Sequence, residues 1–174
     1  MRRKKIIIAL MVAVGATAIL CGITIGVQYF GRSGLEANIG KAIEKKIQSE
    51  EIPGEALPYS IQYSNAVLGA IQYQIISCDQ RNKTATVSFN YVDAIALADQ
   101  YGEIVCDADE FYIFCVNSIT NKTAPFETKE IEIQYYVVEE NGQAFYVIEN
   151  SPELADVLTG GTFSEYLQLI GGVS

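Results

Sequence analysis

The longest uninterrupted apolar pattern lies at the N-terminus, where residues 6–31 contain no charged side chain. As a helix this stretch would be about 39 Å long, and the hydrocarbon core of a bilayer is about 30 Å thick. Four basic residues, 2–5, precede it, so the positive-inside rule places the N-terminus in the cytoplasm. We predict a single-pass protein of the cell membrane. Residues 1–31 would be its cytoplasmic basic tip and transmembrane anchor, with residues 6–30 in the membrane, and residues 32–174 one extracellular domain.

Two other interpretations compete with a retained anchor. Residues 16–18 read "ATA", a small-x-small pattern typical of signal-peptide cleavage sites. Cleavage there would leave the apolar residues 19–30 as an exposed tail, which argues against it. Lipidation at Cys21 is the third interpretation, but Leu20 stands where that pattern has a small residue. The retained anchor is therefore favoured.

Small residues recur every four positions within the same segment, at Ala18, Gly22 and Gly26. This spacing lets two membrane helices approach closely, so it is a candidate homodimer contact. Gly and Ala are also common in membrane helices that form no such contact. Both interpretations stay open.

After the anchor, the apolar residues first recur with the period of an α-helix. Leu35, Ile39, Ile43 and Ile47 recur every four residues and predict an amphipathic helix, with Ser33 as a candidate cap. Residues 53–58, "PGEALP", would end it, because proline and glycine do not continue a helix. A second helical stretch is predicted over residues 64–70.

Two pairs of strands follow, each with alternating apolar and polar positions. Residues 71–78 and 84–92 form the first pair, and residues 130–137 and 144–149 form the second. Asn141-Gly142 between the second pair is a strong hairpin signal. A short helix capped by Asp93 is predicted after the first pair, and a helix that starts at Ser151-Pro152 after the second.

The helix, the hairpin with "TATVSFNYVD" and the stretch "VVEENGQAFYVIENSPELADVLTGG" together resemble a known group of domains. These are the cystatin-like or NTF2-like α+β domains found behind single anchors or lipid tails in Gram-positive bacteria. The resemblance covers roughly residues 35–161, although many such domains have a tryptophan where this chain has Phe145. It implies a curved antiparallel sheet packed on helices, often with a cone-shaped pocket. Enzymes, ligand binders and interaction modules all use this fold.

Charge narrows the choice of partner. Residues 32–174 carry 21 acidic and eight basic side chains, a net charge of −13. Such a surface repels phosphate backbones, so nucleic acid is not an expected partner. The chain has no histidine at all, which removes the commonest general base and metal ligand.

The stretch "VCDADEFYIFC", residues 105–115, contains two cysteines and three acids, the closest grouping of residues that could bind a metal or react. A calcium site needs six to eight oxygens, usually with a turn glycine, and a zinc or redox site needs His or a C-x-x-C pair. We therefore predict neither a metal nor a cofactor here. Asp107, Asp109 and Glu110 are interpreted as a solvated loop that leads into a core strand. Cys78, Cys106 and Cys115 either form one bridge, between Cys106 and one of the others, or stay as buried thiols.

These residues and patterns indicate a class of function and no specific activity. The leading hypothesis is a non-catalytic binding or assembly module for an envelope protein partner. The alternatives are a binder of a small apolar or peptide ligand and an isomerase- or dehydratase-type enzyme that uses Asp93 and Tyr91. Convergent polar groups without partners in a pocket would favour a ligand or catalysis, whereas a filled apolar core would favour interaction.

Overall fold

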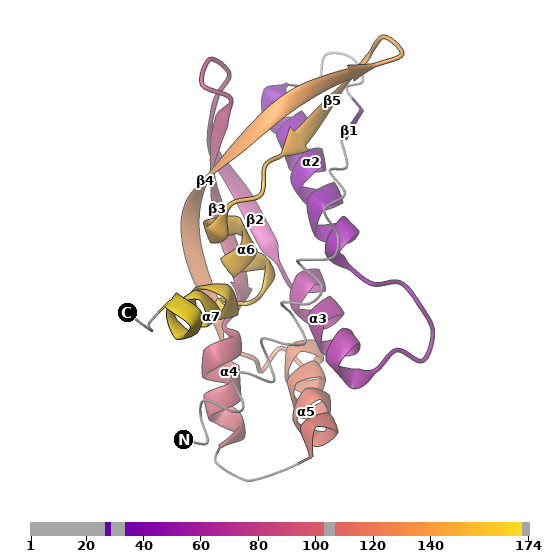
Figure 1. Ribbon diagram of the computed structural model, residues 1–174, viewed down its shortest axis with the longest axis vertical. Helices are drawn as coiled ribbons and strands as arrows, with labels where there is room; N and C mark the ends of the chain where they lie inside the picture. Colours follow the sequence, from indigo (N-terminus) through magenta and orange to yellow (C-terminus); the bar gives the residue numbers. More distant parts are fainter. Residues whose placement is uncertain (1–26, 29–33, 103–106, 172–174) are drawn as a thin grey trace.

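The structure is a computed structural model that describes residues 27–28, 34–102 and 107–171. In these residues the chain is an α+β protein with six helices and an antiparallel sheet (Figure 1). Within the predicted anchor only Val27–Gln28 are described, and they pair with the sheet of the domain as a short edge strand, so the prediction that the membrane segment extends to residue 30 was wrong. The rest of the anchor, its contact through Ala18, Gly22 and Gly26, and Cys106 lie outside the described residues. Among the helices that are described, none has the length and apolar character to cross a bilayer.

The sheet consists of four long antiparallel strands and a short edge strand. They are β2 (Gln72–Asp79), β3 (Thr84–Val92), β4 (Phe126–Glu140), β5 (Gln143–Ile148) and β1 (Val27–Gln28), in the order β1-β5-β4-β3-β2. Both predicted hairpins are confirmed. Asn141 and Gly142 adopt positive φ angles of 52° and 76°, the conformation that a two-residue hairpin turn requires. The sheet curves strongly, most visibly along β4 (Figure 1).

The concave face of the sheet holds the first apolar core. Val87 and Phe89 of β3 and Ile131, Ile133 and Tyr135 of β4 are each 5% exposed or less, as the alternation predicted. The amphipathic helix α2 (Leu35–Glu50) packs into this curve through its apolar stripe. Its predicted span is thus confirmed, whereas the proposed cap Ser33 is not described.

The helix after α2 begins earlier than the sequence indicated. α3 runs from Tyr59 to Gly69 instead of residues 64–70. Pro58 occupies its N-cap position, which suits a residue that lacks an N–H. The side chain of Asn65 fixes the preceding loop, because its Oδ1 accepts from the Ile52 N–H (3.0 Å) and its Nδ2 donates to the Ile52 carbonyl (2.8 Å).

A second apolar core lies between α3, α4 (Ala94–Tyr101) and α5 (Ala108–Thr120), below the sheet in Figure 1. Here the prediction for residues 105–115 was wrong. The acids and aromatics of this stretch start α5 and do not lead into a strand. Phe111 and Cys115, one helical turn apart, both face the core and are 7% and 0% exposed. A short apolar run is compatible with the period of a strand or of a helix. The packing of this segment against α3 favours the helix.

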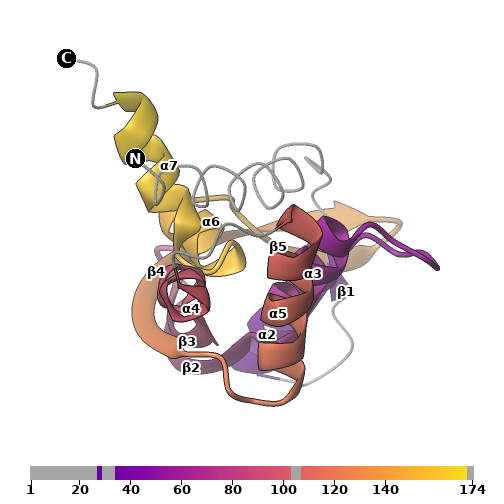
Figure 2. The same cartoon turned by 90° about the horizontal axis from the view of Figure 1, so that it is seen from below.

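The last two helices form a corner at the end of the chain. α6 (Pro152–Leu158) has Ser151 as its cap, with the Leu154 N–H donating to Ser151 Oγ at 3.1 Å, as predicted. Gly160 and Gly161 end it with positive φ angles of 66° and 81°. α7 (Thr162–Gly171) then extends away from the rest of the domain (Figure 2).

Candidate functional site

A pocket of about 430 Å³ opens at the β2–β3 hairpin and reaches β4. Side chains alternate between the faces of a strand, and Ala85 and Val87 point into the core. Thr84 and Thr86 therefore project from the opposite, outer face. The polar residues that line the pocket are Ser77, Asp79, Asn82, Thr84, Thr86 and Glu132.

Asp79 shapes one side of this pocket. Its Oδ1 accepts from the Arg81 N–H (2.8 Å) and the Asn82 N–H (3.0 Å), and its Oδ2 accepts from Asn82 Nδ2 (2.7 Å). The bond from the Asn82 N–H is the main reason that the pKa of Asp79 is lowered. The carboxylate is thus charged at neutral pH and engaged in holding the turn.

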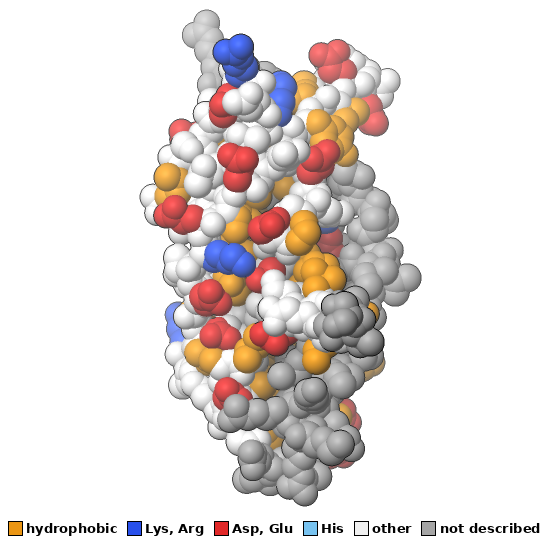
Figure 3. All heavy atoms as spheres, turned by 60° about the vertical axis from the view of Figure 1, so that its left-hand side comes forward, with side chains coloured by type: hydrophobic (Ala, Val, Ile, Leu, Met, Phe, Trp, Pro, Cys, Tyr) orange, Lys and Arg blue, Asp and Glu red, His pale blue; other side chains and the backbone are white. Residues whose placement is uncertain are grey.

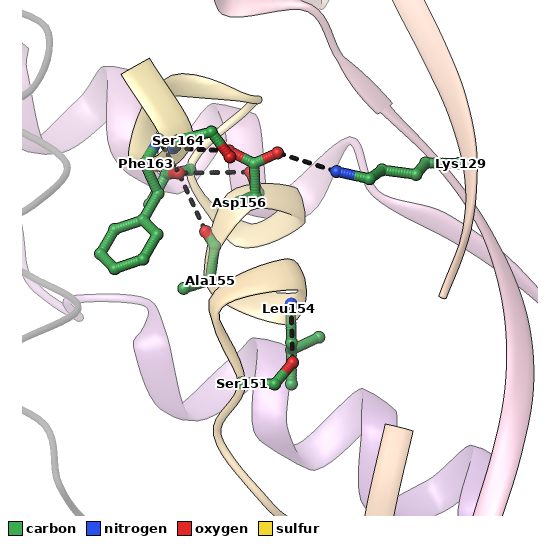
Figure 4. A network of polar contacts seen from close by, with 8 residues as sticks. Lys129, Ser151, Leu154, Ala155, Asp156, Phe163 and Ser164 are labelled. Carbon is green, nitrogen blue, oxygen red and sulfur yellow. Dashed lines mark hydrogen bonds and ion pairs between the residues drawn. The ribbon is translucent and has the colours of Figure 1, made fainter. Parts of the chain in front are cut away.

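A second group of polar side chains lies where the concave face of the sheet meets α6. Lys129 occupies an inward position of β4, and its Nζ lies 3.1 Å from Oδ2 of Asp156, which is 5% exposed (Figure 4). The Ser164 N–H donates to the other oxygen of Asp156 at 2.9 Å. One buried carboxylate therefore joins β4, α6 and the first turn of α7, and both of its oxygens have partners.

Tyr91 and Asp93, the residues considered for an enzyme, lie close to this group. Tyr91 is 1% exposed, and burial, together with the Glu127 carboxylate that its hydroxyl contacts, raises its pKa. The negative charges of Asp156 and Asp93 raise the pKa of Tyr91 further. Asp93 Oδ1 accepts from the Ala96 N–H at 2.8 Å and so caps α4. Tyr91 is therefore a neutral phenol, and Asp93 has a structural role as a cap.

The acids of residues 107–110 also have a structural role. Asp107 is the N-cap of α5, and its Oδ1 accepts from the Asp109 N–H at 3.2 Å. Asp109 and Glu110 stand in the first turn, where negative charge is favourable next to the helix dipole. Across the ranges that the structure describes, no three metal-binding side chains come together.

Cys78 and Cys115 are free thiols in separate parts of the domain. Cys78 packs against the core under the sheet, and Cys115 is fully buried between α3 and α5. Burial raises the pKa of the Cys115 thiol to about 12. A thiol with that pKa is protonated at neutral pH and is not a nucleophile.

The space where a cone-shaped pocket was expected is occupied by apolar side chains. From α2, Ile39 and Ile43 are 0% and 2% exposed, and from α6, Leu154 and Val157 are 3% and 0% exposed. All four belong to the same cluster as the inward residues of β3 and β4. By the criterion set out from the sequence, the filled core favours interaction over catalysis on the concave face, whereas the polar pocket on the outer face meets the criterion for a ligand.

Several large apolar side chains are exposed in the described part of the chain, and three of them lie together on α7. Tyr166, Leu167 and Leu169 are between 37% and 41% exposed, and with Phe163 they fall on one side of the helix. Ser164, Glu165 and Gln168 occupy the other side. Elsewhere on the domain surface acidic side chains are widespread, as one face illustrates (Figure 3).

Comparison with known proteins gave no match to a family model, to a curated protein or to a solved structure. The resemblance to cystatin-like or NTF2-like domains therefore remains an interpretation of the sequence.

Sequence reasoning missed Lys129 and Asp156, although one signal was present. Lys129 stands in the inward phase of the series Lys129, Ile131, Ile133, Tyr135. A lysine at an inward position implies a buried or half-buried anionic partner. The identity of that partner depends on the α6–α7 corner, which no local pattern reveals.

Proposed function

We propose that this chain is a non-catalytic binding or assembly module of the cell envelope, held at the outer face of the membrane by the apolar residues that precede β1, within residues 6–26. The observation that supports it most is the filled concave face, where α2 and α6 occupy the space in which a pocket enzyme of this architecture would hold its substrate. The curved antiparallel sheet around α2 is compatible with the cystatin-like or NTF2-like domain that the sequence resembles.

The polar groups next to that core support the same proposal. A catalytic carboxylate needs a free oxygen directed at substrate. Both oxygens of Asp156 have partners, Asp93 caps α4, and the raised pKa of Tyr91 keeps its hydroxyl protonated. These groups stabilise the junction of sheet and helices.

α7 is the surface through which we propose that the module binds. Its exposed side chains Tyr166, Leu167 and Leu169 form an apolar strip on a helix that projects from the domain (Figure 2). Tyrosine and leucine on a helix face are typical of helix-in-groove contacts. The Asp156 carboxylate, bonded to Ser164 in the first turn, fixes the direction in which this helix points.

Site-specific photo-cross-linking in living cells tests this proposal. A photoreactive residue replacing Leu167 is expected to form a covalent adduct with an envelope partner. The same residue replacing Gln168, one position along on the polar side of α7, is the control and is expected to form much less. Equal yields at the two positions, or none at either, would contradict a contact through α7.

A further inference from the structure

We propose that the pocket on the outer face of β2, β3 and β4 binds a neutral saccharide. The pocket lies on a different surface from α7, so this inference goes beyond the proposed assembly role and does not depend on it.

The register of the strands arranges polar groups in rows across the pocket. Thr86 pairs with Ser77 on β2 and with Glu132 on β4, so two hydroxyls and a carboxylate lie side by side across three strands. Neighbouring strands are about 4.8 Å apart, and the row is therefore about 10 Å long. Thr84 adds a third hydroxyl in the next row, where it pairs with Asp79. A pyranose ring with its hydroxyl groups spans a similar width.

These groups are free to bind a ligand. In the part of the chain that the structure describes, the side chains of Ser77, Thr84, Thr86 and Glu132 make no hydrogen bond to another residue. Thr84 and Thr86 are half-buried, which limits the directions from which a partner can approach. A hydroxyl both donates and accepts, whereas a carboxylate only accepts. The ligand that suits all four is one with many hydroxyl groups.

Charge and size restrict the ligand further. Glu132 and the ionised Asp79 repel phosphate, sulfate and other anions. The volume of about 430 Å³ falls within the range of about 300–1,000 Å³ that is usual for small-molecule sites. A calcium ion would need six to eight oxygens, and the Asp79 oxygens already accept three hydrogen bonds.

An exposed tyrosine stands beside the pocket. Tyr136 is 38% exposed and lies four residues after Glu132 on the same face of β4. The N–H of the preceding residue, Tyr135, donates to the carbonyl of Lys83 at 2.9 Å, which places Tyr136 next to the turn that contains Asn82. Its ring offers an apolar platform with a polar tip, suited to the C–H face of a sugar.

Saturation-transfer NMR on the full chain, in a detergent that contains no sugar, tests the proposal with two probes, cellobiose and N,N′-diacetylchitobiose. Saturation is expected to reach at least one of them. Thr86→Val removes one hydroxyl at nearly constant volume in a strand that favours valine, so we expect the transfer to be strongly reduced while the melting temperature is kept. Tyr136→Leu, on the exposed face, is expected to reduce it as well.

Thr128→Val is the matched control, because Thr128 lies on the outer face of β4 but outside the pocket. It is expected to leave the transfer unchanged. No transfer to either probe, or transfer that survives in both Thr86→Val and Tyr136→Leu, would overturn the proposal. A melting temperature raised by calcium without any transfer to a saccharide would overturn it too, since the pocket would then be a cation site.

Discussion

Replacing Phe89 with alanine is expected to lower the free energy of unfolding by about 3–5 kcal/mol, the range for a large aromatic in a core. Phe89 is 0% exposed in the middle of β3, and its ring centroid lies 6.1 Å from that of Tyr73 on β2. Removal of the ring would leave a cavity between the sheet and α2 that rigid neighbours on both sides cannot fill. Urea unfolding of the full chain, followed by circular dichroism, measures the loss.

Phe126→Ala is the control for this substitution. Phe126 begins β4 on the same sheet but is 41% exposed, so we expect its loss to cost less than Phe89. If Phe89→Ala costs less than about 1 kcal/mol, the assignment of the inward face of β3 is wrong.

Gly160→Ala is expected to cost about 2–4 kcal/mol, because it combines backbone strain with a steric clash. Gly160 has a φ angle of 66°, a conformation that side chains disfavour. A Cβ atom there would lie 2.8 Å from the Val92 carbonyl oxygen and 3.0 Å from the Ala94 Cβ. The Ala94 N–H also donates to the Gly160 carbonyl at 3.0 Å, so the α6–α7 corner cannot move away without losing that bond.

Gly142→Ala is the control that separates the cost of backbone strain from the cost of the steric clash. Gly142 has a similar φ angle of 76°, but nothing lies within 4 Å of its Cβ position. Only the strain of about 1–2 kcal/mol is expected there. Equal losses of unfolding free energy at the two glycines, by thermal or urea unfolding, would show that the corner does not pack against the end of β3 as described.

Much of the sheet follows directly from the sequence. The alternation of apolar and polar residues along β3 and β4 predicted which side chains point into the core, because successive side chains of a strand point to opposite faces. Asn141-Gly142 gave the second hairpin, because these residues tolerate the positive φ angles that the turn needs. Asp93, Ser151 and the pair Gly160-Gly161 gave the ends of two helices through the chemistry of capping.

The sequence-based predictions were wrong or incomplete where contacts between residues far apart in the chain determine the structure. Phe111 and Cys115 fit a strand or a helix equally well, and the contact of α5 with α3 selects the helix. The pocket depends on the registers of Thr86 with Ser77 and with Glu132, which come from strand pairings that single patterns do not encode. The partner of Lys129 was hidden for the same reason.

The central claim, that this domain works outside the membrane on a retained N-terminal anchor, is tested most directly by its topology. In intact cells, protease added from outside is expected to remove a tag placed after Ser174 and to spare a tag placed before Met1. Mass spectrometry of the purified chain should find residues 1–31 still present. A C-terminal tag that stays protected, or a mature N-terminus at Ile19 or Cys21, would contradict the account.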